Sequence, residues 1–459
     1  MWKMKTTWNE DTYQPISDTY EGKCIFVTGS SGFLGKVFVE KILYGCPKIA
    51  KVYILLRDSE KLNVKEKLKQ MLDCPIFKRL KEERPQDLEK IVIIKGDVTK
   101  PKLGISTEDE NVLIENVSMV FHFAATVKFN EPLHVLHNIN IEGTRRLLEL
   151  CSKIKKIEVF LYVSTAFSNG NKEIIDEVVY PPVIPLCKVD ELLKEERTFT
   201  KDQIKDYLKG LPNTYAMSKG IAENLVAQYH RSHKLPVVIV RPSIVISCKN
   251  EPIKGWLANF YGPTPIVLAV KSGIIRAMNC DGNNVLDLIP VDYVSNLVIV
   301  AAARCRSADK VKVFNSCSSA VNPITLQKFL YYVENDNDQK YNCVPYRKTL
   351  FIKFAWLMTM ITFILETIPA YITDCVSRII GKKHIHLKML SKSRNIREAL
   401  KPFTSRTWFI KSHNTTALAN SLSPNDSQVF ACDATHIDWD EYIPLYLLGV
   451  EKYLLDSRK

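Results

Sequence analysis

Residues 24–163 alternate short β-branched runs with segments of helical periodicity, and this alternation constrains the fold more than any other feature of the chain. The strand-like runs read CIFVT, VYILLR, IVIIK, VSMVFH and VFLYV, and a further run, VVIVRPSIV, spans 237–245. They are almost continuously apolar, which is typical of strands covered by helices on both faces. Repeated βαβ units of this kind predict an α/β fold with a doubly wound parallel sheet.

The turn after the first run is rich in glycine and reads Thr28-Gly29-Ser30-Ser31-Gly32-Phe33-Leu34-Gly35. Glycines between a strand and a helix permit a tight turn, close approach of backbone N–H groups to a pyrophosphate, and close helix packing. The turn predicts a Rossmann-like dinucleotide site, with a ligand-free glycine turn as the alternative. The cofactor-binding residues expected here and at the ends of the third and fourth runs are Thr28, Gly29, Ser31, Gly32, Phe33, Leu34, Gly35, Asp97, Val98, Ala124 and Ala125.

The second run ends in Arg57, at the position that contacts the adenine ribose of a bound dinucleotide. An acidic residue there would accept a hydrogen bond from a 2′-hydroxyl, whereas arginine accommodates a 2′-phosphate. Arg57 therefore predicts NADPH rather than NADH, and a solvated arginine at the end of a strand is the alternative.

Tyr215 and Lys219 lie four residues apart in TYAMSKG, which places a phenol and an ammonium on one face of a predicted helix. A nearby ammonium stabilises a phenolate, so we expect Lys219, together with the positive nicotinamide of the oxidised cofactor, to lower the pKa of Tyr215 from its usual value of about 10 toward neutrality. The pair predicts proton exchange with a substrate oxygen beside the cofactor.

The fifth run ends Val163-Ser164-Thr165, where a hydroxyl would lie beside Tyr215 and bind the same substrate oxygen. Thr165 is the first candidate and Ser164 the second, with backbone capping as the alternative for either. Asn140 is expected at the start of the preceding helix, as a cap or as the holder of a proton-relay water near Lys219, and it joins the predicted cofactor residues. His122 is expected to be a buried core histidine.

Lysine and arginine number 63 against 50 acidic residues, and the surplus is concentrated between 378 and 411, where ten basic residues stand beside one acid, a balance of +9. This basic segment follows the most apolar stretch, Leu350 to Ile372, and the pairing predicts a membrane surface facing the cytosol. The uninterrupted apolar part, 354–365, is too short to cross a bilayer, so we expect an interfacial or re-entrant anchor, with a buried core helix as the alternative. Nucleic acid is not expected, because no nucleic-acid motif accompanies the basic run.

The organisation along the chain suggests three parts. Residues 1–22 form an N-terminal extension, 23–330 a nucleotide-binding domain whose region from about 249 to 330 contacts substrate, and 340–459 a smaller, mainly helical domain. A Pro- and Lys-rich insertion at 168–213 is expected to cover the site as a lid or a partner surface. The 12 cysteines have no metal-binding spacing, so we expect reduced thiols and no metal site.

The glycine turn, Arg57, the hydroxyl pair, Tyr215 and Lys219 together resemble the extended short-chain dehydrogenase/reductases. A narrower resemblance is to the alcohol-forming fatty acyl-CoA reductases, including their insect members, and covers about 23–455. It is carried by TGSSGFLGK, KVYILLR, FHFAATVKF, NIEGTRRLLEL, YVSTAFSN, TYAMSKGIAE, IVRPSIV, GWLANFYGPT, IPVDYVSN, FTSRTWFI and IDWDEYIPLYLLGVEKYLL. Ser30 departs from the alanine that the family often has in the glycine turn.

This resemblance implies NADPH-dependent reduction of a long-chain acyl-CoA to a fatty alcohol in two hydride transfers through an aldehyde. It assigns Tyr215, Lys219, Thr165 and Ser164 to catalysis and implies an acyl pocket, for which GWLANFYGPTP and the insertion before Tyr215 are candidate walls. The endoplasmic reticulum is the expected membrane. The alternatives are a sterol-type or sugar-nucleotide enzyme of the same superfamily, and a membrane-tethered nucleotide-bound scaffold.

Overall fold

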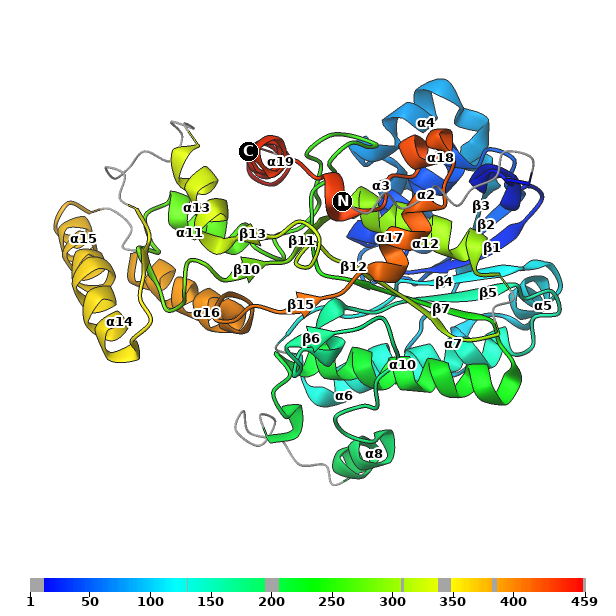
Figure 1. Cartoon of the computed structure of the whole chain (residues 1–459), viewed down its shortest axis with the longest axis horizontal. Helices are drawn as coiled ribbons and strands as arrows, with labels where there is room; N and C mark the ends of the chain where they lie inside the picture. Colours follow the sequence, from blue (N-terminus) through cyan, green and yellow to red (C-terminus); the bar gives the residue numbers. More distant parts are fainter. Residues whose placement is uncertain are drawn as a thin grey trace, which may run out of the picture.

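A seven-stranded parallel sheet forms the centre of the protein (Figure 1). The computed structural model describes residues 12–129, 131–194, 206–306, 309–336, 348–381 and 386–456. The sheet has the order β12-β7-β5-β4-β1-β2-β3. Its strands are β1 (Cys24–Thr28), β2 (Lys51–Leu56), β3 (Ile91–Lys95), β4 (Met119–His122), β5 (Val159–Val163), β7 (Val237–Pro242) and β12 (Lys312–Ser316). The prediction of a doubly wound parallel sheet is confirmed, and the strand order reverses between β1 and β4, where such sheets bind ligands.

Helices cover both faces of the sheet (Figure 1). Alternate strand residues point to opposite faces, so Val27 packs with α2 (Phe33–Gly45) and α12 (Val291–Arg304), while Phe26 packs with α7 (Gly143–Cys151) and α10 (Thr214–His233). Strands covered on both faces need apolar side chains on both, which explains the nearly unbroken apolar runs of the sequence. Smaller helices at the margins are α1 (Ile16–Thr19), α3 (Val64–Leu72), α4 (Lys78–Glu83), α5 (Thr107–Asn116), α6 (Leu133–Leu136) and α8 (Leu186–Lys194).

Two elements from the region 249–330 belong to this central layer. β12 extends the sheet by pairing with β7, with Val313 opposite Ile239, and α12 packs directly against α2. The rest of this region forms a second hydrophobic core beside the sheet, in which Phe329 contacts Tyr446. Its helices are α11 (Thr264–Lys271), α13 (Leu326–Asn335) and α19 (Trp439–Val450).

The C-terminal part of the chain returns to the part that forms the central sheet. After α16 (His386–Thr404), β15 (Phe409–Ile410) pairs in parallel with β6 (Ile174–Ile175), which lies inside the Pro- and Lys-rich insertion. α17 (His413–Asn420) then packs against β12 and α12, and α18 (Pro424–Val429) follows. The insertion is thereby tied to the C-terminal segment, whereas its residues 195–205 lie outside the described part of the chain.

The apolar stretch forms one continuous helical run, which consists of α14 (Ala355–Thr362), a π-helical turn (Phe363–Thr367) and α15 (Ile368–Ile379). The run Ala355–Ile379 has 25 residues and is long and apolar enough to cross a membrane, judged by length and composition alone. Only 17% of its most apolar window is buried, so the alternative of a buried core helix is wrong.

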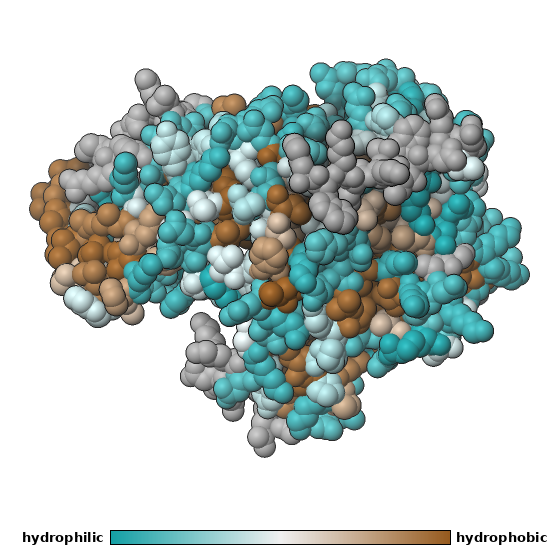
Figure 2. All heavy atoms as spheres, viewed as in Figure 1, coloured by the Kyte–Doolittle hydropathy of each residue, from teal (hydrophilic) through white to brown (hydrophobic). Residues whose placement is uncertain are grey.

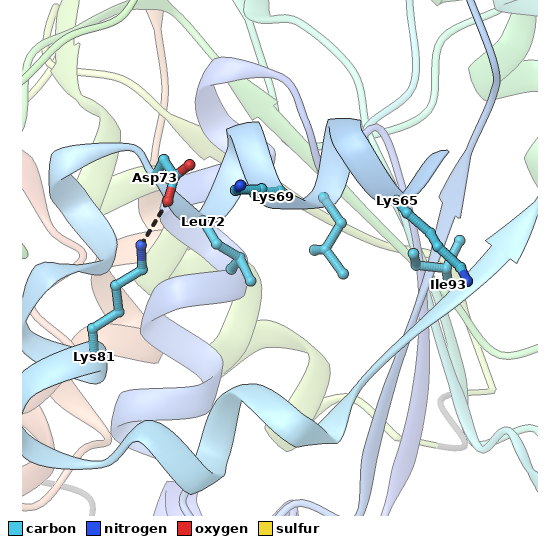
Figure 3. Close-up of a pocket in the computed structure, with 7 residues that line it drawn as sticks. Lys65, Lys69, Leu72, Asp73, Lys81 and Ile93 are labelled. Atoms are coloured by element: carbon cyan, nitrogen blue, oxygen red, sulfur yellow. Dashed lines mark hydrogen bonds and ion pairs between the residues drawn. The ribbon is translucent and has the colours of Figure 1, made fainter. Parts of the chain in front are cut away.

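A shallow cavity of about 340 Å³ lies between α3, the following turn and β3 (Figure 3). Its floor is apolar and its rim carries lysines, one of which, Lys81, pairs with Asp73 at 2.9 Å. None of its lining residues belongs to the predicted site, so the cavity is separate from the candidate active site described next.

Candidate active site

The glycine turn closes against the end of β4. Gly29 has a φ of +74°, and a Cβ added there would lie 2.6 Å from the backbone nitrogen of Ala124. At Gly35 a Cβ would lie 2.2 Å from the Gly29 carbonyl oxygen, so the first turn of α2 sits directly on the loop. These two positions require glycine, for the reasons that a dinucleotide turn requires it.

The N-terminus of α2 is open. Gly32 is its N-cap, and within the described residues no side chain accepts a hydrogen bond from the first helical N–H groups. Ser31 and Gly32 are exposed at the crest of the loop. An uncapped helix N-terminus that follows a glycine turn is a binding site for an anion, so these residues fit the pyrophosphate of a dinucleotide.

Arg57 and Asp97 meet at the ends of β2 and β3. The Arg57 Nη1 lies 3.2 Å from the Asp97 Oδ2, and the arginine side chain is 63% exposed. Burial acts to raise the pKa of Asp97, but hydrogen bonds from Thr99 and Arg57 outweigh it and hold that pKa below its usual value. The exposed guanidinium keeps donors available to a ribose phosphate beside the open α2 terminus.

Tyr215 and Lys219 occupy the first turns of α10, whose N-cap, Asn213, accepts a hydrogen bond from the Ala216 backbone. The ammonium of Lys219 is buried, donates to the Val163 carbonyl at 2.7 Å and lies 4.5 Å from the centre of the Tyr162 ring. Burial lowers the pKa of Lys219 to about 7. The lysine is therefore held between α10 and the end of β5.

Lys219 by itself does not lower the pKa of Tyr215. Burial raises the pKa of the phenol well above 10, and Lys219 does not offset this, because its ammonium points to the Val163 carbonyl. Tyr215 therefore keeps its proton at neutral pH. A protonated phenol at this position is suited to donating a proton to a substrate oxygen.

Ser164 and Thr165 follow β5 and differ in their surroundings. The Ser164 backbone is still paired with β7, and its buried Oγ has no hydrogen-bond partner in the described part of the chain. Thr165 lies one residue further, where its Oγ1 accepts from the Phe167 N–H at 3.4 Å and donates to the Pro242 carbonyl at 3.5 Å. Both contacts are long for hydrogen bonds, so the Thr165 hydroxyl is only weakly engaged.

The sequence predicted Asn140 at the start of a helix, and this is wrong. Asn140 lies inside a π-helical turn, His137–Glu142, between α6 and α7. Its Oδ1 accepts from the Thr126 N–H at 2.9 Å and its Nδ2 donates to the Ser218 Oγ at 2.9 Å. Ser218 in turn donates to the Tyr215 carbonyl at 2.8 Å. Asn140 thus ties the loop after β4 to the first turn of α10, and π-helical turns are frequent at functional sites.

His122 is a buried core histidine, as predicted, and both of its ring nitrogens are engaged. Nδ1 lies 2.7 Å from Thr28 Oγ1 and Nε2 lies 3.0 Å from Thr144 Oγ1. Because Thr144 donates its own proton to the Asn140 carbonyl, Nε2 must carry the histidine proton. Burial lowers the pKa of His122 to about 3, so the ring stays neutral and links the glycine turn to the Asn140 turn.

A buried ion pair that the sequence did not predict lies one helical turn after Lys219. Arg241 of β7 and Glu223 of α10 are completely buried and meet at 2.7 Å, and Glu223 also accepts from Ser168. Arg241 further donates to the Asp176 and Val178 carbonyls of the insertion. The only sign of this ion pair in the sequence is that Glu223 follows Lys219 by four residues, on the same face of the helix. A charged residue at such a spacing is usually exposed to solvent, so the sequence did not predict a buried pair.

An aromatic cluster extends from Tyr215 to the C-terminal segment. Phe129 lies 6.3 Å from the Tyr215 ring centre and stacks on Phe403 at 5.7 Å. Phe403, the last aromatic residue of α16, meets Phe167 at 4.9 Å, and Phe167 meets Trp408 at 5.0 Å. The C-terminal segment therefore forms an apolar wall that is linked to the Tyr215 ring through Phe129.

Contacts at α10 and at the ends of β1, β4 and β5 connect the predicted site residues. The glycine turn contacts Ala124, Lys219 contacts the residue before Ser164, and Asn140 contacts the turn that carries Tyr215. Val98 packs against Gly143 at the start of α7, where a Cβ would lie 3.1 Å from the valine Cβ. No group of three or more metal-ligating side chains occurs among the described residues.

Solved structures share the fold. The terminal reductase domain of the myxalamid biosynthetic pathway matches with a TM-score of 0.64 and 20% identity over 94% of this chain and 91% of that domain. A reductase domain of a Mycobacterium tuberculosis nonribosomal peptide synthetase matches with a TM-score of 0.63 and 17% identity, over 95% of this chain and 94% of its own.

Sequence comparisons identify the family. Models of two families, both described as male sterility protein, match residues 27–298, as an NAD-binding domain, and 365–457. Fatty acyl-CoA reductase 1 of Xenopus laevis is 36% identical over 96% of this chain and 86% of its own length. The human enzyme of the same name is 35% identical over the same shares, and fatty acyl-CoA reductase wat of Drosophila melanogaster is 31% identical over 97% of this chain and 88% of its own. The chain therefore belongs to the fatty acyl-CoA reductase family.

Proposed function

We propose that this protein reduces long-chain fatty acyl-CoA to fatty alcohol and CoA with NADPH as the reductant. The observation that carries the proposal is the geometry at α10. Tyr215 lies one helical turn before the buried Lys219, Lys219 donates to the carbonyl of the residue that precedes Ser164 and Thr165, and the dinucleotide turn has an open helix N-terminus. Relatives at 35–36% identity over nearly the whole chain carry the name of this activity.

The cofactor supplies the hydride when it is bound. The glycine turn and the open α2 terminus would hold its pyrophosphate, and the exposed Arg57 would hold a 2′-phosphate, which favours NADPH over NADH. The ammonium of Lys219 lies at the carboxyl end of β5, and there it would contact the nicotinamide ribose.

In the first reduction, Thr165 and Tyr215 donate hydrogen bonds to the thioester oxygen as negative charge develops on it, and Ser164 is the second candidate donor. The tetrahedral species then collapses, the carbon–sulfur bond breaks, and CoA leaves as the thiolate, which takes a proton from solvent. An aldehyde remains against the aromatic cluster formed by Phe129, Phe403 and Phe167.

In the second reduction, Tyr215 gives its proton to the alkoxide oxygen and is reprotonated from solvent through its neighbours. A raised phenol pKa suits this role, because the proton is present on the enzyme before each reduction. Asn140 positions the turn that carries Tyr215 and provides the amide for a relay water near Lys219.

We propose that the chain divides as the motifs suggest, into 1–22, 23–330 with a substrate-binding part from about 249, and 340–459. The two family matches, 27–298 and 365–457, support this division. We also propose association with a cytosol-facing membrane, for which the endoplasmic reticulum is the first choice. The exposed apolar helix Ala355–Ile379 and the basic segment after it support the association with a membrane.

The test is product analysis with membranes that contain this chain, given C14 to C18 acyl-CoAs with NADPH or with NADH. We expect fatty alcohol with NADPH and two cofactor molecules consumed per alcohol. Tyr215→Phe should lower the rate about 10²–10⁴-fold, because it removes the proton donor and keeps the ring.

Thermal stabilisation of the Tyr215→Phe variant by NADPH is the control for folding and cofactor binding. If a folded protein that binds NADPH yields neither alcohol nor aldehyde from any acyl-CoA, the proposal is wrong. Equal rates with NADH would overturn the choice of cofactor alone.

A further inference from the structure

We propose that α14 and α15 lie parallel to the surface of an anionic phospholipid bilayer, with one face immersed, so that these helices dock on the membrane without crossing it. The inference rests on the proposed function in one respect, namely that a long-chain acyl-CoA partitions into such a surface.

One side of the helical run is exposed and apolar. These side chains, which we call the apolar face, are between 40% and 84% exposed: Phe354, Trp356, Met360, Phe363, Ile364, Ile368, Tyr371, Ile372, Val376, Ile379 and Ile380. Figure 2 shows the corresponding hydrophobic patch at the end of the molecule formed by α14 and α15. A contiguous apolar patch of this kind marks an interaction site.

The π-helical turn keeps the apolar face on one side along the whole run. In a regular α-helix, the sixteen steps from Trp356 to Ile372 would place these two side chains about 160° apart around the axis. The turn Phe363–Thr367 accommodates one extra residue and reduces this separation by about 100°. Trp356, Phe363, Ile372 and Ile379 thereby share one side, which suits a flat surface.

The opposite side is fixed to the protein. Glu366 is buried and accepts hydrogen bonds from Arg397 Nη2 at 2.7 Å and from the Arg276 backbone at 3.0 Å. Asp374 is also buried and accepts from the backbone N–H groups of His386 and Leu387, each at 3.0 Å. Polar anchors at the middle and near the end of the run hold it along α16.

Both ends of the run are also joined to the same body. Before it, β14 (Leu350–Phe351) pairs with β9 (Ala277–Met278), and the Asn279 side chain donates to the Ile352 carbonyl at 2.8 Å. After it, α16 runs back to the active site. A spanning orientation would draw Glu366, with its arginine partner, into the hydrocarbon, whereas an orientation in the plane leaves every anchor on the aqueous side.

The charges around the apolar face match an anionic lipid surface. Arg378, Lys388, Lys392 and Arg394 are exposed on α15 and α16. The two acids of the helical run, Glu366 and Asp374, are buried and already hydrogen-bonded. Basic residues beside an immersed apolar face are typical of helices that lie in an anionic interface.

The first experiment measures cosedimentation of the purified full chain with vesicles of phosphatidylcholine, with or without phosphatidylserine. We expect binding that increases with phosphatidylserine and that falls at least tenfold in Trp356→Ser/Phe363→Ser. Tyr331→Ser/Leu448→Ser is the matched control, because both residues are 60% exposed on other helices, and it should bind as the wild type does.

A second pair of variants tests the charge. Lys388→Glu/Lys392→Glu should remove the increase in vesicle binding that phosphatidylserine produces. Lys65→Glu/Lys69→Glu on α3 makes the same charge change at an exposed site outside α14–α16, and this control should retain the increase. Stabilisation of each variant by NADPH shows that it is folded.

Depth distinguishes docking from spanning. In a Trp356→Phe background, tryptophan is introduced singly at Ile364, Ile372 or Ile379, and quenching is compared between lipids brominated near the headgroup and near the chain end. A helix in the plane gives similar quenching ratios at all three positions and at the native Trp356. A spanning helix gives markedly deeper quenching at Ile364 than at Ile379, because each residue adds about 1.5 Å along the axis.

Deeper quenching at Ile364 alone would overturn the docked orientation. Absence of wild-type binding, or equal loss in both serine variants, would overturn the docking surface. A change of oligomeric state in Trp356→Ser/Phe363→Ser without loss of vesicle binding would reassign the apolar face to a second copy of the chain. These measurements use neither acyl-CoA nor turnover, so their failure is distinct from failure of the proposed reaction.

Discussion

Thr165 lies just past the end of β5, and its hydroxyl is held only by two long contacts, whereas the Ser164 side chain belongs to a residue still paired in the sheet. Ligands of such sheets bind beyond the carboxyl ends of the strands. The position of Thr165 therefore favours it as the donor to the substrate oxygen, and Ser164 is one of several buried hydroxyls that have no hydrogen-bond partner among the described residues.

We expect Thr165→Val to lower kcat about 10²–10³-fold, the usual effect of losing one donor to a developing oxyanion. Ser164→Ala should lower it less than tenfold. Steady-state kinetics on a C16 acyl-CoA measure both, with NADPH affinity as the control for the site. The opposite order of effects would transfer the role to Ser164.

Lys219 makes stability depend on pH. Its pKa is about 7 in the folded protein and 10.5 ordinarily, so the unfolded chain binds more protons between these values and folding is favoured as pH rises through this window. Below pH 7 the full cost of burying the charge is present.

We expect Lys219→Met to raise the free energy of unfolding above that of the wild type, by up to a few kcal/mol, with the largest difference at pH 7 and below. The gain should shrink steadily toward pH 10. Thermal unfolding of both proteins across this range measures the difference, and a difference independent of pH would show that Lys219 is not buried as a titrating group.

At the scale of elements, α16 joins two regions that have different chemistry. Its N-terminus is capped by Asp374 of the exposed apolar run, and Phe403 near its C-terminus enters the aromatic cluster at Tyr215. Nineteen residues of helix span about 28 Å, so this helix sets the distance between the apolar face and the Tyr215 phenol.

Phe403→Ala should lower kcat/KM for C18 acyl-CoA at least tenfold and affect a water-soluble short-chain aldehyde little, because the variant removes an apolar wall and leaves Tyr215 in place. Leu448→Ala, a truncation of an exposed side chain on α19, is the control. Equal losses on both substrates would show that Phe403 acts only by supporting the fold.

Sequence patterns predicted the sheet and the glycine turn well, because burial on both faces and a tight turn impose strict local requirements on Val27, Gly29 and Gly35. They failed where long-range contacts decide the outcome. The pKa of Tyr215 depends on where the Lys219 ammonium points, and spacing along a helix does not contain that information.

The aromatic cluster was missed for the same reason. Phe403 and Trp408 meet Phe167 only because β15 pairs with β6, a short contact between distant segments that leaves no periodic signal. The site assignments themselves stay predictions until variants are measured.

At the scale of the whole molecule, the C-terminal segment packs against the sheet part of the chain and does not form a separate appendage. α17 covers β12 and α12, the Asn414 side chain donates to the Val313 carbonyl, and Trp408 donates to the Gly170 carbonyl. Arg241 holds the insertion from the other side.

A chain truncated after residue 336 should therefore fail to reduce acyl-CoA and should bind NADPH at least tenfold more weakly than the full chain, because the surface of α12 and the wall beside Tyr215 are uncovered. Coexpression of residues 348–459 should restore part of both. Isothermal titration and product analysis measure the outcome, and a truncated protein with full activity would favour a self-contained enzyme of the wider superfamily.

The contact between Trp408 and Gly170 joins residues 238 positions apart. During synthesis on the ribosome, the sheet and α10 emerge long before the residues that finish the wall at Tyr215. A nascent chain can therefore form its nucleotide-binding part early while its acyl site stays open to solvent. An acyl site with this wall is therefore formed only after synthesis has passed residue 408.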